Sequence, residues 1–250
     1  MVRSFGSVFF ASACTLVAVI TLVGQVEPPR PPVTRKHALE ELSEGASLVL
    51  MHPILRPLLF VSVVYNLSWF FLMAALVPSL RTGLHETATL IGITLGAYGV
   101  GLMLGAAIAA RVLRRLPLHV VLSLGPVSAE VAALLMLSTL PYHSFILAGA
   151  SLFVFGVGPM IWAVSTATLR QQITPLPILA RTIAVVTFAT FGARPLGAAL
   201  GAAIGGAFGA RGCLITVAIG FMLQATIFFA ARLSPHLEVF KDGALDLKRR

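Results

Sequence analysis

The chain has 250 residues, of which 58% are hydrophobic and 11% charged, and its mean hydropathy is +0.95. Soluble domains carry roughly 25% charged residues, so this chain cannot cover a water-facing surface and is predicted to be an integral membrane protein. The net charge is +9, but the basic residues stand in short clusters between apolar runs, which indicates orientation in a bilayer and argues against nucleic-acid binding.

Hydrophobic segments of membrane-spanning length recur along the chain, and strand-like alternation is absent. A helical span needs about 20 apolar residues. The sequence therefore predicts an all-α membrane protein with seven transmembrane helices. The predicted spans are Phe5–Gly24, Leu58–Leu80, Thr87–Ala110, Val120–Leu140, Ser144–Leu169, Thr182–Phe208 and Cys213–Ala231. The first could also be a signal peptide, but its apolar run exceeds the roughly 7–15 residues of a signal core, which favours an uncleaved span.

The predicted organisation has four parts. They are residues 1–26 with the first span, residues 27–54 as a cytoplasmic linker, residues 55–233 with six spans, and residues 234–250 as a cytoplasmic tail. Within the linker, residues 36–50 predict an amphipathic helix on the membrane surface. Its apolar face would carry Leu39, Leu42, Ala46 and Val49. His52 follows this helix and is expected to cap a helix or to lie at the interface.

Basic residues separate the two sides of the predicted membrane protein. Alternate connections hold 14 of the 18 lysines and arginines, and the opposite connections hold only Arg3, Arg81 and Arg211. The positive-inside rule makes the richer side cytoplasmic. We therefore expect a multi-pass protein of the cell (inner) membrane, with its amino terminus outside and its carboxy terminus in the cytoplasm, which requires an odd number of spans.

Glycines repeat every fourth residue in the sixth predicted span. Gly197, Gly201 and Gly205 share one helix face, and Gly209 follows in the same register. Small residues at this spacing let another membrane helix approach closely, so the three glycines are predicted to pack against a neighbour. The third span carries similar pairs, Gly92 with Gly96 and Gly101 with Gly105. Gly209 to Gly212 is expected to turn the chain into the last span.

Two ionisable residues lie inside predicted spans. Glu130 stands in the middle of one, where an acid costs perhaps 2.5–3.5 kcal/mol on insertion scales, so it is a candidate for proton coupling. The alternative is a protonated acid that bonds a neighbouring helix. Arg194 precedes Pro195 and could bond the carbonyls that the proline frees, pair with Glu130, snorkel, or attract an anionic substrate.

Polar and aromatic residues share one face of the second span. Tyr65, Asn66, Trp69 and Met73 follow helical spacing, which suits a cavity wall for an amphipathic substrate. An ordinary interhelical hydrogen bond from Asn66, with the aromatic rings facing lipid, is the competing interpretation. Trp162 lies on a similar face of the fifth span and is a further cavity candidate.

The order of several short motifs resembles the major facilitator superfamily, closest to the branch of enterobactin exporters and related drug exporters. These motifs are Glu27-Pro28-Pro29, Glu44-Gly45, His52–Leu59, Asn66, Gly105 with Arg111–Arg115, Leu169–Gln171, Thr174-Pro175, Leu179–Arg181 and Pro195–Ala198. The resemblance implies twelve spans in two six-helix halves with substrate between them. This chain would supply the sixth span, the central loop and the carboxy-terminal half, and hence one wall of the site.

The same resemblance suggests roles for basic residues near the predicted cytoplasmic side. Arginines there could latch an inward-closed state by pairing across the two halves, or could serve orientation alone. The latch candidates are Arg111, Arg114, Arg115, Arg170 and Arg181, with Arg194 as a gating candidate inside its span.

The expected function is secondary active transport, specifically proton-coupled export of a small amphipathic molecule such as a siderophore or drug. The alternative is a truncated, non-transporting membrane protein or an interaction partner that needs a separate amino-terminal half. An enzyme is not expected, because no catalytic constellation stands at helical spacing. No metal or cofactor is expected either, and Cys14 and Cys213 read as buried hydrophobes. The expected partners are the lipid bilayer, the small-molecule substrate, and a missing amino-terminal half or a second copy; nucleic acid is not among them.

Overall fold

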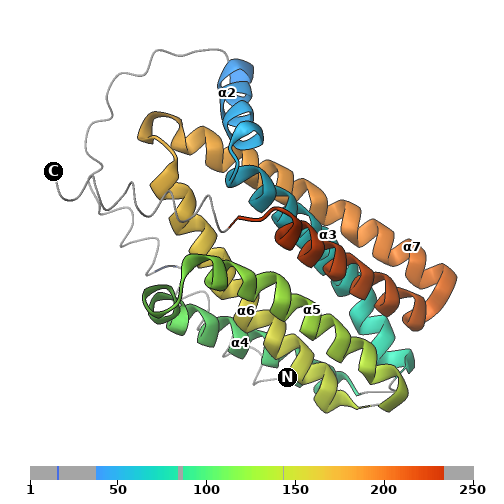
Figure 1. Cartoon of the computed structure of the whole chain (residues 1–250). Coiled ribbons are helices and arrows are strands. Elements are labelled where there is room, and N and C mark those ends of the chain that lie inside the picture. Colours follow the sequence, from blue (N-terminus) through green and yellow to red (C-terminus); the bar gives the residue numbers. More distant parts are fainter. Residues whose placement is uncertain (1–15, 17–37, 84–86, 143, 234–250) are drawn as a thin grey trace. The chain divides into compact units, whose positions relative to one another are not determined.

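A computed structural model describes residue 16 and residues 38–83, 87–142 and 144–233 of the chain. By its internal contacts the chain divides into two units, Met1–His37 and Ala38–Arg250, and every helix named below belongs to the second. These helices are α2 (Ala38–Met51), α3 (Leu55–Gly83), α4 (Ala88–Arg115), α5 (Leu118–Tyr142), α6 (Phe145–Ile173) and α7 (Leu176–Ala230) (Figure 1). The described residues form no strand, as the prediction of an all-α protein requires.

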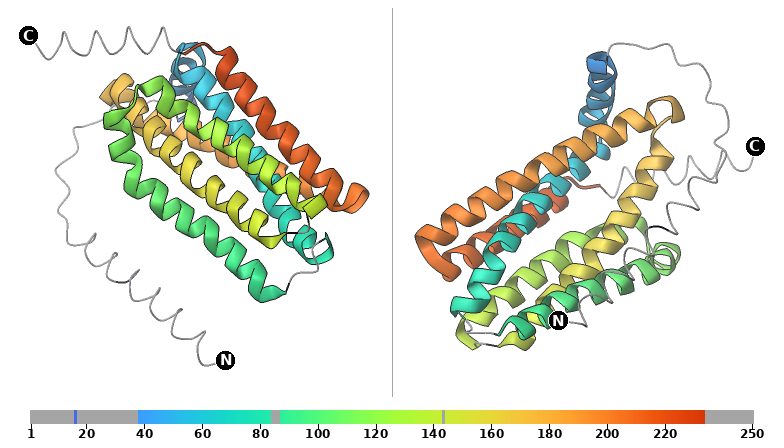
Figure 2. Two further views of the ribbon diagram at one scale, coloured as in Figure 1. Left: turned by 60° about the horizontal axis from the view of Figure 1, so that its bottom comes forward. Right: turned by 180° about the vertical axis from the view of Figure 1, so that it is seen from behind.

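Five of these helices, α3 to α7, are long and apolar enough to cross a membrane. The last has 55 residues, which at 1.5 Å per residue would make a rod of roughly 80 Å, far longer than a bilayer core of about 30 Å. It reverses at Gly209, and its second arm runs back beside the first, as the right-hand view of Figure 2 shows. The predicted first span, residues 5–24, lies outside the described residues, so the count of seven stays a prediction.

The reversal of α7 depends on the backbone of Gly209, which has φ 64° and ψ −166°. This region of conformational space is essentially open to glycine alone. We expect Gly209→Ala to destabilise the fold by about 1–3 kcal/mol, because a side chain at this φ is strained although no atom lies within 4 Å of the site.

Gly206→Ala is the matched control. It also meets no neighbour within 4 Å but is helical, so alanine should be neutral or stabilising by up to about 1 kcal/mol. Unfolding of the purified chain in mixed micelles would measure both, and equal effects of the two changes would contradict this role of Gly209.

Glycines bring two pairs of helices to backbone distance. A Cβ atom on Gly197 would lie 2.2 Å from the Leu67 carbonyl oxygen, and one on Gly201 would lie 2.5 Å from the Phe71 carbonyl oxygen. These contacts join the first arm of α7 to α3. Gly205 differs, because its nearest neighbour is the Cys213 sulfur, 3.3 Å from a Cβ built there, on the second arm of α7 itself.

The second pair is α4 with α6. A Cβ on Gly101 would lie 2.3 Å from the Phe153 carbonyl oxygen, and one on Gly156 would lie 2.5 Å from the Tyr98 carbonyl oxygen. The pair predicted from Gly92 and Gly96 behaves differently: neither has a neighbour within 4 Å in the described part of the chain. The spacing of glycines identifies two faces of α4 that could pack closely, and the position of α6 determines that only the face of Gly101 and Gly105 does so.

These contacts reveal an internal repeat. In both pairs the residue numbers rise together along the two helices, so α3 runs parallel to the first arm of α7, and α4 runs parallel to α6. The tight connections make successive segments antiparallel. Let α3 be matched with α6, α4 with the first arm of α7, and α5 with the second arm. The contact between α3 and the first arm of α7 then corresponds to the contact between α6 and α4. This one correspondence is the contact pattern that two three-segment repeats of opposite orientation would give.

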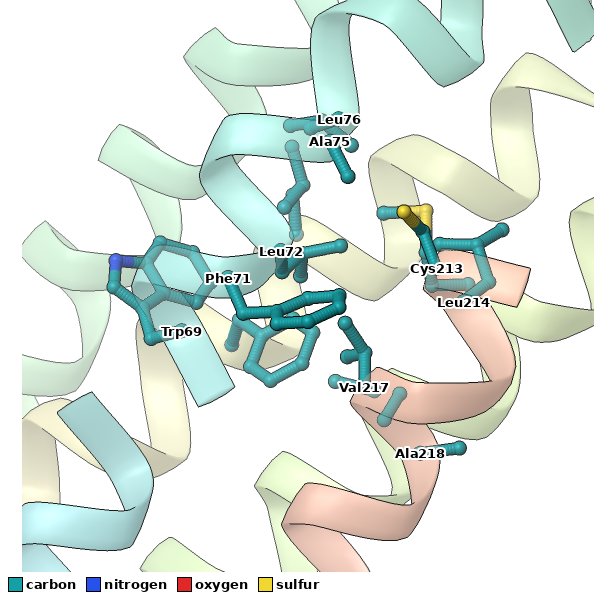
Figure 3. Packing of buried hydrophobic residues seen from close by; sticks show 14 of the residues in the cluster. Trp69, Phe71, Leu72, Ala75, Leu76, Cys213, Leu214, Val217 and Ala218 are labelled. Atoms are coloured by element: carbon teal, nitrogen blue, oxygen red, sulfur yellow. The ribbon is translucent and has the colours of Figure 1, made fainter. Parts of the chain in front are cut away.

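Apolar side chains fill the space between α3, α5, α6 and the second arm of α7. The largest cluster of buried residues includes Leu72, Phe155 and Phe221, all without exposed surface. Figure 3 shows its members from α3 and from the second arm of α7. Many buried hydroxyl groups in these helices bond a backbone carbonyl, although the buried side-chain oxygens of Ser68 and Gln224 have no hydrogen-bond partner among the described residues. Ser151 on α6, for example, donates a 2.6 Å hydrogen bond to the Ala132 carbonyl of α5.

Helix α2 packs differently from the sequence expectation. It contacts α7 and α3, with Val49 fully buried, while Leu42 is 44% exposed and so leaves the predicted apolar face. Gly45 lies close to α7, because a Cβ built there would lie 3.0 Å from the Arg181 backbone. The Arg181 side chain also pairs with Glu44. His52 caps α3 as expected, because its Nδ1 accepts from the amide of Ile54 at 3.1 Å. The position of α2 on a membrane surface stays a prediction.

Most described arginines gather at one end of the bundle. The start of α3, the α4–α5 connection, the α6–α7 connection and the end of α7 share this end, because successive segments are antiparallel. We call it the basic end; it carries Arg56, Arg111, Arg114, Arg115, Arg170, Arg181 and Arg232. The opposite end carries Arg81 and Arg211, so the helix arrangement agrees with the distribution of charge along the sequence.

Candidate substrate cavity

A cavity of about 330 Å³ opens among α3, α4, α6 and the first arm of α7. It is lined by Ser62, Tyr65, Asn66, Tyr98, Leu102, Pro159, Met160, Trp162, Ala163, Thr166, Ala167, Arg170, Val186, Thr187, Thr190 and Arg194. Aromatic rings, threonine hydroxyls and an amide share this wall with two guanidinium groups. A mostly apolar hollow with a few convergent polar groups is what small-molecule sites have in common.

Arg194 makes the only side-chain to side-chain hydrogen bond found among the described lining residues of this cavity. Its Nε donates a 3.0 Å hydrogen bond to Oδ1 of Asn66, whose Nδ2 in turn donates to the Ser62 carbonyl at 2.9 Å. The guanidinium carbon lies 3.6 Å from the centre of the Phe191 ring and 5.1 Å from that of Phe70. Cation–π contacts of this kind favour a guanidinium that has left water. Arg194 is therefore fixed by its neighbours rather than extended toward the end of its helix.

The aromatic side of the cavity is held by a stack of rings behind it. Trp69 is only 7% exposed and lies 4.7 Å from the ring centre of Tyr98 and 6.4 Å from that of Tyr65. It does not itself line the cavity. Trp69 thus supports Tyr65 and Tyr98, which do, and it packs on Phe155 of the core at 5.1 Å.

Four predicted cavity or gating residues from three helices come together here: Tyr65, Asn66, Trp162 and Arg194. Arg170, proposed from the sequence as a latch, also lies on the cavity wall. Arg111, Arg114 and Arg115 are exposed at the end of α4, away from the cavity lining, and Arg181 is engaged with Glu44. The latch candidates therefore do not form one group in the described part of the chain.

Glu130 stands apart from the cavity on α5. Its Oε2 is buried and has no hydrogen-bond partner, and the described residues show no ion pair between Glu130 and Arg194. The pairing considered from the sequence is thus replaced by the bond from Arg194 to Asn66. Residues 38–83, 87–142 and 144–233 also contain no group of three His, Cys, Asp or Glu side chains that could hold a metal ion.

Sequence reasoning missed several lining residues. Tyr98 on α4 carries an isolated phenol in an apolar helix, which was a usable signal. Thr187 and Thr190 precede Arg194 by seven and four residues, so helical spacing places all three on one face. Leu102, Met160 and Ala163 line the cavity without any signal in the sequence, because ordinary apolar residues become a wall only when their helices are placed.

Comparison with known proteins identifies the family. A family model described as transmembrane secretion effector matches residues 2–244. No curated protein and no solved structure matches the chain. Inverted three-segment repeats are also a feature of major facilitator transporters. The matched length and the fold agree, and the chain belongs to the transmembrane secretion effector family of the major facilitator superfamily of membrane transporters.

Proposed function

We propose that the chain is the carboxy-terminal half of a proton-coupled exporter, related to enterobactin and drug exporters, which moves a small amphipathic molecule out of the cell. The observation that carries this proposal is the 330 Å³ cavity, because it joins aromatic and polar side chains from four helices of one half-bundle. A major facilitator binds its substrate between two halves. The described helices thus supply one wall, and the other wall would come from a separate amino-terminal half or from a second copy of the chain.

Sidedness follows from the same arrangement. The basic end would face the cytoplasm of a cell (inner) membrane, by the positive-inside rule. Residues 27–54 would then form the cytoplasmic linker, and the amino terminus would lie outside. A reporter fused after Arg250 should be active only on the cytoplasmic side.

Glu130 is the proposed coupling residue. A buried carboxyl oxygen without a hydrogen-bond partner is costly when it is ionised and tolerable when it is protonated. Exposure to water in another conformation of the transporter would let this group release its proton. Arg111, Arg114 and Arg115 would contact the opposite half near the basic end and favour the state that is closed on that side. The alternative is a non-transporting chain that only binds a partner.

An efflux assay tests the proposal. Cells would express the chain alone or together with the first five spans of a full-length family member, loaded with an amphipathic fluorescent dye or a catecholate siderophore. We expect efflux in the combined cells, at least a tenfold loss of it with a protonophore, and a similar loss with Glu130→Gln. Glu40→Gln, which removes a carboxylate from α2, is the control and should retain most of the efflux.

The outcomes separate the hypotheses. Efflux that ignores the protonophore would refute proton coupling. A combined protein that reaches the membrane but moves no substrate would favour the non-transporting alternative. Efflux by the chain alone would show that a second copy can supply the missing wall.

A further inference from the structure

The cavity carries positive charge that nothing in its lining balances. Two of its sixteen lining residues are arginines, Arg170 and Arg194, and none is Asp or Glu. The described helices hold few acids at all. Glu44 pairs with Arg181, and Glu130 does not line the cavity. A cationic group inside a membrane protein is costly unless an anion or a strong dipole faces it.

The geometry of Arg194 leaves its best hydrogen-bond donors available. Nε is occupied by Asn66, and the guanidinium carbon lies over the rings of Phe191 and Phe70. The two terminal amino groups have no hydrogen-bond acceptor among the described residues. Two parallel N–H groups in a fixed plane match the two oxygens of a carboxylate or a catecholate. Because its neighbours already hold the Arg194 side chain in place, binding a ligand costs little further side-chain entropy, which favours tight binding.

The rest of the wall suits the body of such a ligand. Tyr65, Tyr98 and Trp162 line the cavity with aromatic surface, and Trp69 holds two of these rings from behind. Arg170 adds a second positive group on the same wall. From these observations we propose that the cavity binds organic anions, with an oxyanion on the terminal amino groups of Arg194 and an aromatic body against Tyr65, Tyr98 and Trp162. This inference rests on the proposed transport function and names the substrate class of the same cavity.

Charge selectivity can be measured by the fluorescence of Trp162. The chain has two tryptophans, and Trp69→Phe leaves Trp162, which lines the cavity, as the only reporter. The unchanged chain, titrated in parallel by the fluorescence of both tryptophans, controls for the loss of the Trp69 ring behind Tyr65 and Tyr98. The probes are 4-phenylbutyrate, 4-phenylbutyramide and 4-phenylbutylamine, which share one apolar body and differ in charge. We expect the carboxylate to bind the purified chain in nanodiscs at least tenfold more tightly than the amide, and the amine to bind most weakly.

Variants of the Arg194 group separate charge from packing. Arg194→Gln should remove the preference for the carboxylate, and Arg194→Lys should retain part of it because the charge remains but the planar pair of donors is lost. Asn66→Asp should also abolish the preference, because it places a carboxylate on Arg194 while keeping the hydrogen bond. Arg56→Gln, exposed at the start of α3 and outside the cavity lining, is the charge-matched control and should leave all three affinities unchanged.

The inference fails if the carboxylate binds no more tightly than the amide, or if Arg194→Gln keeps the preference. These results are distinct from failure of the transport proposal. Efflux of only neutral or cationic compounds would refute anion selectivity and leave transport standing. Selective carboxylate binding by a chain that supports no efflux would refute transport and leave the anion site.

Discussion

Replacing Gly197 by alanine is expected to push α7 away from α3 and to destabilise the fold by about 3 kcal/mol, at the upper end of the roughly 1–3 kcal/mol typical of overpacking. The added Cβ would lie 2.2 Å from the Leu67 carbonyl oxygen and 3.1 Å from the Leu67 Cα. Both are backbone atoms, so no side-chain rotation can relieve the overlap and a whole helix must shift. Lipid gives membrane helices no hydrophobic drive to associate, so close packing of this kind supplies much of their affinity.

Gly192→Ala is the matched control for this change. Gly192 lies on the same arm of α7, but a Cβ there meets no atom within 4 Å. Alanine is the better helix former by up to about 1 kcal/mol, so this variant should be neutral or slightly more stable. Denaturation in mixed micelles would compare the two variants, and equal stability would show that the α3–α7 contact is not made at backbone distance. Gly201→Ala should behave like Gly197→Ala, because its Cβ would lie 2.5 Å from the Phe71 carbonyl oxygen.

Replacing Gly156 by alanine should separate α4 from α6 and distort the cavity. Its Cβ would lie 2.5 Å from the Tyr98 carbonyl oxygen and 2.7 Å from the Leu102 amide nitrogen, again backbone atoms. Tyr98 and Leu102 line the cavity from α4, and Trp162 lines it from α6, so their separation should change the wall. We expect a loss of at least about 2 kcal/mol in stability together with at least tenfold weaker binding of 4-phenylbutyrate.

Gly149→Ala, on the same helix, controls for the loss of glycine itself. It meets no neighbour within 4 Å and should leave both stability and binding near those of the unchanged protein. Stability and Trp162 fluorescence would be measured on the same preparations. A Gly156→Ala protein with ordinary stability and ordinary binding would show that the α4–α6 contact does not hold the cavity wall.

The six predicted spans that fall within the described residues agree with the helices because hydrophobic length is a local property. Each apolar run of about 20 residues must satisfy its own backbone hydrogen bonds in lipid, which leaves a helix as the available structure. The sequence also predicted the turn between the last two spans, at Gly209 to Gly212. The structure has this turn at Gly209, whose backbone angles only glycine adopts readily. The local hydrophobicity of each segment therefore predicted the helix boundaries, with the largest difference at the start of α7, which begins at Leu176 and was predicted to begin at Thr182.

The candidate cavity was visible only in part, and two residues show why. Asn66 and Arg194 are each unusual within an apolar helix, so the sequence marked both, but their bond joins residues 128 positions apart. Trp69 and Trp162 were marked by the same argument, yet one lies in the core and the other on the cavity wall. Helical spacing assigns a residue to a face, and it carries no information about which helix that face meets.

By itself the sequence determined that this protein crosses a membrane through apolar helices and that its basic residues gather on one side. It also showed that Glu130 and Arg194 lie inside apolar spans, where an ionisable group is energetically unfavourable. Only the tertiary structure decided that Gly197 and Gly101 pack at backbone distance while Gly92 does not, and that Arg194 is fixed by Asn66 beside a cavity without acids. The physical reason is that hydrophobic length and charge are properties of single segments, whereas packing and cavities exist only between segments.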